Sequence, residues 1–371
     1  MQGLPIYDIW RILSEPREIA EGEIRGLCRT SYLGDHQALT RILGRYKLYV
    51  DTRDIGIASH LMLDGYWEMW VTEAMMRLLR RGAVVADVGA NLGYFTVLMA
   101  DLTGADGHVL SFEPNPQLAP LVRKSVEING FAGFTRCYDC GLGAAAGWAQ
   151  VEAAVDHPGG GRTLPIADNP PADEGAQDIC KEVAEDALHP VPQPKGLLRT
   201  ITALLSPEPL PLPDLSAETS AGETEALALG DEESPPLPGA VRICRFDELP
   251  RALEVEFMKI DVEGFEPHVW QGMTGRLENY DLPLTIFMEF TISRFAQARE
   301  FLDEILSWGF SLSIITFRDG VVSITPEALF AGPSDVDHML VFQRAARMDE
   351  IPRSDVTEAT GFSSEDEIGG S

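Results

Sequence analysis

Apolar residues recur along the chain at two spacings, and the two spacings alternate. From Trp67 to Leu78 they recur every three or four residues, which predicts an amphipathic helix that Gly82 ends. Beyond it, short β-rich runs alternate with helical stretches, and this alternation predicts a parallel sheet with helices on both faces. The predicted strands span residues 84–88, 108–112, 135–140, 255–262 and 284–290, and the predicted helices span 93–102, 117–129, 267–273 and 295–308.

The last β-rich runs, residues 310–317, 321–324 and 338–342, lack helical patterns between them and predict an antiparallel pair at one edge of the sheet. Residues 1–60 combine a predicted helix over 8–22, interrupted at Pro16, with a strand over 45–50. We interpret them as an N-terminal extension. The remaining divisions are the two parts of the main domain, 61–155 and 241–346, an insertion over 156–240, and a tail over 347–371.

Acidic residues concentrate outside the predicted sheet. The proline-rich insertion holds 16 acidic and 4 basic residues and shows little periodicity, so we predict that it is largely disordered. The tail has 7 acidic and 2 basic residues, and we predict disorder there too. The whole chain carries 58 acidic and 29 basic side chains, a formal net charge of -29. This charge disfavours nucleic acids and anionic membrane surfaces as partners.

Features of exported and membrane-spanning proteins are missing from the sequence. The first ten residues carry no Lys or Arg ahead of an apolar run, unlike a secretory signal, and no stretch of about 18 apolar residues predicts a membrane span. The five cysteines have no disulfide-framework spacing, which indicates a reducing compartment. We therefore expect a cytoplasmic protein.

A glycine-containing turn follows the first predicted strand of the sheet. Its glycines allow the backbone to approach a ligand, and the next helix begins with unpaired N–H groups. Glu113 ends the second strand, 20 residues beyond Gly93, where a carboxylate can accept hydrogen bonds from both hydroxyls of a ribose. This pattern predicts a nucleoside site at the carboxyl ends of the strands. Its candidate residues at the turn are Asp87, Gly89, Asn91, Gly93 and Tyr94.

The residue types at the turn indicate which nucleoside binds. A dinucleotide site has a glycine where Asn91 stands, and the carboxylate of Asp87 would repel a diphosphate. Asp87 suits a ligand with a cationic amino group, and S-adenosylmethionine combines a ribose, a sulfonium and an ammonium. The alternative is that Asp87 only caps the turn and Glu113 only caps the next helix.

Several segments resemble the FkbM-type family of S-adenosylmethionine-dependent methyltransferases. They are the turn at 87–94, Phe-Glu-Pro-Asn at 112–115, Phe-Met-Lys-Ile-Asp-Val-Glu-Gly-Phe-Glu at 257–266 and Phe-Met-Glu at 287–289. The resemblance runs from about Tyr66 to Phe342, without the insertion. It implies a Rossmann-like class I methyltransferase sheet of seven strands, the last antiparallel. It also implies S-adenosylmethionine as the cofactor and O-methylation of a hydroxyl on a sugar, glycan or polyketide-like molecule.

The resemblance also implies further contacts with the cofactor. It places Glu68 near the cofactor, although an acid at a helix N-terminus explains Glu68 equally well. Asp139 and Cys140 end the third predicted strand, where class I methyltransferases contact adenine. Cys137 and Cys140 have C-x-x-C spacing without a second pair, so we interpret them as strand residues rather than a metal or redox site.

Carboxylates follow the fourth and fifth predicted parallel strands. Methyl transfer needs the acceptor oxygen in line with the leaving sulfur, and a general base lowers the barrier. Asp261 is the first candidate, followed by Glu263 and His268. In a continuing strand, Asp261 and Glu263 would face one side and raise each other's pKa, unless Lys259 neutralises one of them. Glu289 could join Asp261 around a divalent cation, but two ligands are too few, so we predict no metal.

Two other functions share parts of this pattern. A non-catalytic scaffold could recruit a basic partner through the acidic insertion. An NAD-dependent oxidoreductase would share the sheet and the ribose-binding acid. Binding of S-adenosylmethionine distinguishes the methyltransferase from a bare scaffold and from the oxidoreductase. The sequence leaves the acceptor, expected to be a small molecule or a glycan, and the oligomeric state open.

Overall fold

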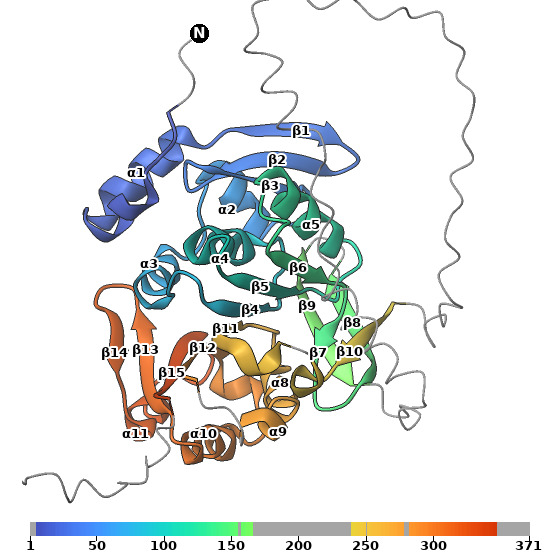
Figure 1. The fold of residues 1–371 in the computed structure, drawn as a ribbon, viewed down its shortest axis with the longest axis vertical. Helices are drawn as coiled ribbons and strands as arrows, with labels where there is room; N and C mark the ends of the chain where they lie inside the picture. The colour runs from blue at the N-terminus through green and yellow to red at the C-terminus, as the bar shows by residue number, and fades with distance from the viewer. Residues whose placement is uncertain (1–4, 155–156, 166–238, 250, 278–281, 347–371) are drawn as a thin grey trace, which may run out of the picture.

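The computed structural model describes residues 5–154, 157–165, 239–249, 251–277 and 282–346 (Figure 1). Most of the predicted disordered insertion (166–238) and the tail (347–371) lie outside these residues. An eight-stranded sheet has the order β14-β13-β15-β12-β11-β4-β5-β6. Its strands are β4 (Val84–Val88), β5 (His108–Phe112), β6 (Thr135–Tyr138), β11 (Val255–Ile260), β12 (Leu284–Phe290), β13 (Ser311–Thr316), β14 (Gly320–Ser323) and β15 (His338–Arg344).

Five neighbouring strands of this sheet, β6, β5, β4, β11 and β12, run parallel. β15 is antiparallel to both of its neighbours, β12 and β13, and β14 adds an antiparallel edge strand. Without β14, seven strands remain, and β15, the last of them along the chain, is antiparallel to its neighbours. The predicted class I methyltransferase sheet is therefore confirmed. The strand order proceeds from β4 in both directions, and open parallel sheets bind ligands at the carboxyl ends beside such a reversal.

Alternate residues of each strand face opposite sides of the sheet. In β4, Val85 packs with α3 and α4 on one side, whereas Val84 and Ala86 pack with α8, α9 and α10 on the other. The predicted helical stretches are occupied by α4, α5, α8 and α10. The helices are α3 (Met69–Leu78), α4 (Tyr94–Thr103), α5 (Ala119–Ile128), α8 (Glu266–Gln271), α9 (Thr274–Leu277), α10 (Ala298–Ser307) and α11 (Pro326–Phe330), with 3-10 turns η2 (Phe246–Glu248), η3 (Ala252–Glu254) and η4 (Ile292–Arg294).

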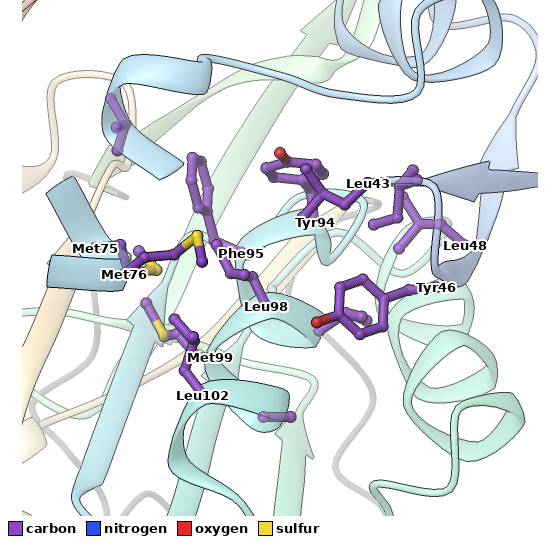
Figure 2. Close-up of a cluster of buried hydrophobic side chains, with 14 of the residues drawn as sticks. Leu43, Tyr46, Leu48, Met75, Met76, Tyr94, Phe95, Leu98, Met99 and Leu102 are labelled. Atoms are coloured by element: carbon purple, nitrogen blue, oxygen red, sulfur yellow. The ribbon is translucent and has the colours of Figure 1, made fainter. Parts of the chain in front are cut away.

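The N-terminal extension forms a layer beside α4 and α5. Figure 2 shows Phe95 and Leu98 of α4 between Met75 of α3 and Tyr46 of the extension. The Tyr46 hydroxyl also donates a hydrogen bond to Asp101 at 2.7 Å. The elements of this layer are η1 (Ile9–Leu13), α1 (Arg17–Leu27), β1 (Thr30–Gly34), β2 (Gln37–Ile42), β3 (Tyr46–Asp51) and α2 (Ile57–Leu63).

The extension differs from its prediction in three elements. The helix expected over 8–22 is divided into η1 and α1, because Pro16 stands directly before α1, where its fixed φ and missing N–H suit a helix start. The strand expected over 45–50 is β3, which pairs with β2 in an antiparallel sheet of order β1-β2-β3; the sequence pattern did not predict β1 and β2. β1 is almost wholly exposed, so it has no alternation to detect. Helix α2 was also missed.

A third sheet, of order β7-β10-β8-β9, joins the chain on either side of residues 166–238. Residues 157–165 form a strand, although the predicted insertion begins at 156. The strand was not predicted because the Gly-Gly-Gly run there carries no alternating pattern. Pro165 and Val241 both lie opposite Ala149 in this sheet. Its strands are β7 (Gly141–Leu142), β8 (Gly147–Ala154), β9 (His157–Pro165) and β10 (Ala240–Cys244). Among the helices of the described residues, none has the length and apolarity that crossing a membrane requires.

Candidate functional site

A cleft opens at the carboxyl ends of β4, β5 and β11, where the strand order reverses. It encloses about 800 Å³, including space open to solvent, which lies within the usual range of small-molecule sites. Polar groups line it on either side of β4: Glu113 on the β5 side, and Lys259, Asp261 and Glu263 on the β11 side. The apolar lining consists of Ile57, Trp67, Leu92, Phe95, Pro114 and Leu118.

The turn after β4 brings two distant parts of the chain together. Gly89 has a φ of 81°, and a Cβ atom there would lie 1.9 Å from the Asp261 carbonyl oxygen, so no larger residue fits. The Asp261 N–H also donates a hydrogen bond to the carbonyl of Val88, the residue before Gly89, at 3.0 Å. The sequence predicted that this glycine admits a ligand. In the structure, Gly89 lines the cleft, and its missing side chain also leaves room for the backbone of Asp261 directly after β11.

The other turn residues differ in their positions. Gly93 has a φ of 83° and its missing Cβ makes room for Val122 of α5, so its role is in packing, and it does not line the cleft. Asn91 has a left-handed φ of 54° and lines the cleft. Tyr94 also lines the cleft, and its hydroxyl lies 3.0 Å from that of Thr72.

Two backbone N–H groups hold the carboxylate of Glu113 in the cleft. The Asn91 N–H donates to Oε2 at 2.7 Å and the Asn115 N–H donates to Oε1 at 2.8 Å. Glu113 is only 8% exposed, and burial raises its pKa to about 7, although both N–H donors favour the charged form. Glu113 therefore caps the turns at Asn91 and Asn115 and not the next helix, α5, which has no side-chain cap. Each of its oxygens keeps a second lone pair for a ligand hydroxyl.

Asp87 is fully buried in β4 and does not line the cleft. Its Oδ2 accepts a hydrogen bond from the Thr96 hydroxyl at 2.5 Å, and its Oδ1 has no hydrogen-bond partner among the described residues. Burial raises its pKa, and the charge of Lys259 opposes that rise. A contact between Asp87 and the amino group of the cofactor stays a prediction.

Asp139 and Cys140 lie outside the lining of the cleft. Strand β6 ends at Tyr138, before both residues, rather than at 140. Asp139 forms an ion pair with Arg123, and Cys140 is buried in the apolar core. The charge of Asp139 nevertheless contributes to the raised pKa of Glu113, and a contact of either residue with the adenine stays a prediction.

Three carboxylates gather where β11 and β12 end. Asp261, Glu263 and Glu289 each offer an oxygen, and these oxygens lie within 4.8 Å of one another. We call these three acids the carboxylate cluster. Lys259 Nζ lies 2.8 Å from Asp261 Oδ2. Arg294 Nη1 lies 3.1 Å from Glu263 Oε2 and 2.5 Å from Glu289 Oε2, so two cations hold the cluster together.

Burial makes the charges of this region strongly interdependent. Lys259 is only 2% exposed; burial disfavours its charge, but Asp261 and Asp87 outweigh that effect and raise its pKa. Burial, with the charges of Asp261 and Glu263, raises the pKa of Glu289 to about 9. Glu289 is therefore the acid of the cluster that holds a proton near neutral pH.

Glu68 lies beside this cluster, on the segment that leads into α3. It has a left-handed φ of 37° and is half-buried. Burial and the charge of Asp261 raise its pKa to about 7, and Lys259 opposes the rise. The sequence expected Glu68 near the cofactor; the structure places it within electrostatic reach of Asp261.

The chain brings Asp261 and Glu263 together by a turn. The expectation of a strand continuing to Val262 is wrong, because β11 ends at Ile260 and Glu263 has a left-handed φ of 56°. The alternative that Lys259 pairs with one of the two acids is correct for Asp261. Carboxylate oxygens are ligands that divalent cations accept. Here, the Arg294 guanidinium already contacts two of the three acids.

His268 lies outside the cleft, in the first half of α8. Its ring stacks on Phe265, with the ring centroids 4.2 Å apart. Burial lowers its pKa, so the imidazole is neutral near pH 7. His268 instead lines a second cavity, which also adjoins Arg294.

Sequence reasoning missed two residues of the site. Arg294 follows β12 in η4, and nothing in the local pattern relates it to acids 31 and 5 residues earlier (294 − 263 and 294 − 289). Ile57 reaches the cleft from the N-terminal extension, in a helix that was not predicted. Both depend on tertiary contacts that no local spacing encodes.

The sheet and the cleft together define a Rossmann-like protein with a nucleoside-type site at the reversal of its strand order. Comparison with protein families narrows this class. Residues 87–312, more than half of the chain, match the methyltransferase FkbM domain. The chain belongs to the FkbM methyltransferase family, which confirms the predicted family, the methyltransferase class and S-adenosylmethionine as the cofactor.

Similarity to individual proteins is more limited. The chain is 40% identical over 57 residues to a protein-L-isoaspartate O-methyltransferase of Ignicoccus hospitalis, which is 15% of this chain and 27% of that protein. It is 43% identical over 49 residues to a protein of the same name from Methanothrix thermoacetophila, which is 13% of this chain and 23% of that protein. The chain thus spans about a quarter of the length of these relatives.

Solved structures of methyltransferases are similar only at a low level. A SAM-dependent O-methyltransferase of Thermotoga maritima has 10% identity and a TM-score of 0.34, with 84% of this chain and 79% of that chain covered. A precorrin-6y C5,15-methyltransferase of Geobacter metallireducens has 11% identity and a TM-score of 0.31, with coverages of 74% and 88%. The family assignment therefore rests on the domain match and not on these structures.

The residues present fit S-adenosylmethionine. The Glu113 carboxylate, held in the cleft by two N–H groups, has lone pairs left for the ribose hydroxyls. Apolar side chains, including Leu92 and Leu118, can cover the adenine. The carboxylates of Asp261 and Glu263 line the β11 side and suit the positive charge of the sulfonium, beside which the acceptor must lie.

Proposed function

We propose that the protein transfers a methyl group to a hydroxyl of a sugar or glycan. One observation carries the proposal: a single cleft holds a buried carboxylate suited to a ribose and, across β4, carboxylates suited to an acceptor hydroxyl. Bound S-adenosylmethionine supplies an electrophilic methyl group, and the chain's own residues position the groups around it. The excess of acids disfavours a carboxylate acceptor, because like charges repel.

Asp261 is the proposed general base. It lines the cleft, and its Oδ2 lies 2.8 Å from Lys259 Nζ, which orients the carboxylate. An alcohol attacks more readily as its proton is withdrawn, so a carboxylate within hydrogen-bond reach of the hydroxyl lowers the barrier. Asp261 accepts that proton as the oxygen forms its bond to the methyl carbon and the carbon–sulfur bond breaks.

Glu263 and Glu289 have supporting roles in this proposal. Arg294 fixes both side chains, so they can orient acceptor hydroxyls by accepting or donating hydrogen bonds. Glu289 holds a proton near neutral pH because its pKa is raised to about 9. It is therefore suited to donate a hydrogen bond rather than to act as the base.

The test separates cofactor binding from transfer. Calorimetry of the full chain with S-adenosylhomocysteine measures the first, and transfer of a radiolabelled methyl group to a panel of methyl glycosides measures the second. We expect Asp261→Asn to lower kcat by roughly 100-fold or more while the affinity for S-adenosylhomocysteine stays within about threefold. Unchanged turnover in this variant would exclude Asp261 as the base.

The alternatives give other outcomes in the same experiment. A bare scaffold does not bind S-adenosylhomocysteine, and an NAD-dependent oxidoreductase is protected against thermal unfolding by NAD instead. A scaffold that retains the cofactor binds it but transfers no methyl group. Glu113→Ala tests whether the bound ligand uses this carboxylate, because a ligand with ribose hydroxyls there loses affinity.

A further inference from the structure

A second cavity lies next to the cofactor cleft, between the start of α8 and the segment from η4 to α10. It encloses about 920 Å³, including space open to solvent, and the described residues that line it contribute no established function. Gly264 and His268 line it from the α8 side, and Arg294, Phe295 and Gln297 line it from the α10 side. We call it the side cavity.

The walls of the side cavity and of the cleft are adjacent at two places. Glu263 lines the cleft, and the next residue, Gly264, lines the side cavity. Arg294 lines the side cavity while its guanidinium contacts Glu263 at 3.1 Å. A molecule that occupies the side cavity therefore ends beside the carboxylate cluster, where the proposed transfer takes place.

The walls of the side cavity combine flat rings with hydrogen-bonding groups. Phe295 is half-buried, and the His268 ring is held flat against Phe265. Gln271 and Gln297 are exposed amides, which both donate and accept hydrogen bonds. Ring faces beside amides match a sugar, which has apolar C–H faces and a rim of hydroxyls.

The charge of the side cavity excludes some ligands. Glu300 and Glu304 line it, and their side chains are exposed. The one cation among its described lining residues is Arg294, which already pairs with Glu263 and Glu289. No described lining residue thus offers an unengaged positive charge to a phosphate, and two carboxylates repel one.

We propose that the side cavity is the acceptor subsite and binds an uncharged sugar unit, so that glycosides are preferred to sugar phosphates and nucleotide sugars. This proposal rests on the proposed function, since it places the sugar next to the transferred methyl group. It assigns to His268 and Phe295 the recognition of the sugar, and to Arg294 the boundary between acceptor and cofactor.

Saturation-transfer NMR on the full chain with bound S-adenosylhomocysteine tests the proposal. The probes are methyl glycosides of glucose, mannose, galactose, fucose and rhamnose, with mannose 6-phosphate as the anionic counterpart. Gln297→Trp and Gln271→Trp fill the cavity from opposite walls. Ser307→Trp is the matched control, because Ser307 is an exposed α10 residue that lines neither cavity.

We expect at least one glycoside to bind the parent protein and Ser307→Trp. Each cavity-filling variant should weaken that glycoside roughly tenfold or more while S-adenosylhomocysteine affinity is unchanged. Mannose 6-phosphate should bind roughly tenfold more weakly than methyl mannoside. The subsite is overturned if both cavity-filling variants bind the glycoside as tightly as the parent protein does. It is also overturned if mannose 6-phosphate binds more tightly than methyl mannoside, or if no glycoside binds.

These outcomes separate the subsite from the proposed function. If a glycoside is methylated at the same kcat/KM by the parent protein and Gln297→Trp, the function stands and the subsite is wrong. If the parent protein does not bind S-adenosylhomocysteine, the proposed function itself is wrong. Near-ultraviolet circular dichroism of each variant confirms that the tryptophan has not disturbed the fold.

Discussion

The acids on the two sides of β4 are held in different ways. The Glu113 carboxylate accepts hydrogen bonds from two backbone N–H groups. Asp261, Glu263 and Glu289 are instead held by the side chains of Lys259 and Arg294. Backbone donors are fixed once the turns form, whereas side-chain cations must be delivered by separate elements and must lose rotamer freedom.

This difference separates a fixed half of the site from an adjustable half. Neutral backbone donors hold Glu113 without adding a charge, so its pKa of about 7 is set mainly by burial. In the carboxylate cluster, the charges of Asp261 and Glu263 raise the pKa of Glu289, and the charge of Arg294 opposes that rise. Under the proposed function, the fixed half binds the cofactor and the adjustable half faces the acceptor.

The largest effect that tests this contrast is expected for Lys259→Met. Loss of the ammonium leaves Asp261 and Asp87 without their cation in a region where Lys259 is only 2% exposed. We expect the free energy of unfolding to fall by about 3–5 kcal/mol in urea denaturation. Lys124→Met, on the surface of α5, is the control and should change it by less than about 0.5 kcal/mol. A small effect of Lys259→Met would mean that the two acids are neutral in the fold.

The next largest effect is expected on the backbone-held side. Glu113→Ala should weaken S-adenosylhomocysteine binding by about 10- to 100-fold in calorimetry, since hydrogen bonds to a carboxylate contribute about 1.5–3 kcal/mol. Glu113→Gln keeps one acceptor oxygen, so its affinity for S-adenosylhomocysteine should lie between those of the parent protein and Glu113→Ala. Glu127→Ala serves as the control, because Glu127 is an exposed α5 residue outside the lining of the cleft. Equal losses in Glu127→Ala and Glu113→Ala would contradict the assignment of the ribose site.

A smaller effect is expected when the acceptor side loses its guanidinium. Arg294→Gln removes the guanidinium that contacts both Glu263 and Glu289, and the free energy of unfolding at about pH 8 should fall by about 2 kcal/mol. The double variant Arg294→Gln/Glu289→Gln should regain about half of the loss, as measured by a double-mutant cycle. Cofactor affinity should not change. A parallel loss of cofactor affinity would show that the two sides are not independent.

The smallest effect is the pH dependence of cofactor binding. The Glu113 pKa is raised to about 7, so the ionised acceptor is lost as the pH falls through 7. Affinity for S-adenosylhomocysteine should be up to about tenfold lower at about pH 6 than at about pH 8, and Glu113→Gln should flatten this difference. The unliganded fold has the opposite sign: stability from protonated Glu113 is present below about 4.5 and is lost as the pH rises through about 7.

The contrast also explains how much the sequence could predict. Asn91 and Glu113 belong to turns whose residue types follow from local geometry, so the nucleoside side was predicted from spacing. The carboxylate cluster was predicted only as a set of acids, because its geometry depends on the left-handed turn at Glu263 and on Arg294 from a later element. The parallel sheet was predicted because its buried strands are continuous apolar runs.

The missed strands show the limit of pattern reasoning. β1 is exposed at nearly every residue, so it has no buried face and no apolar alternation. Its position is instead fixed by pairing with β2, and β2 in turn pairs with β3, which contacts α5 through the Tyr49 N–H and the Ser125 hydroxyl at 2.9 Å. Such partner-dependent strands cannot be predicted from one segment alone.

The pairing of Pro165 and Val241 with the same residue, Ala149, has a consequence for the architecture. In the sheet of order β7-β10-β8-β9, the chain leaves at the end of β9 and re-enters at β10. Two strand spacings separate these points, a gap of about 10 Å that about three to five residues can bridge. The catalytic scaffold can therefore host intervening chain of almost any length. A tag or a foreign domain inserted between these two strand ends should leave the pairing of β8 with β9 and β10 intact.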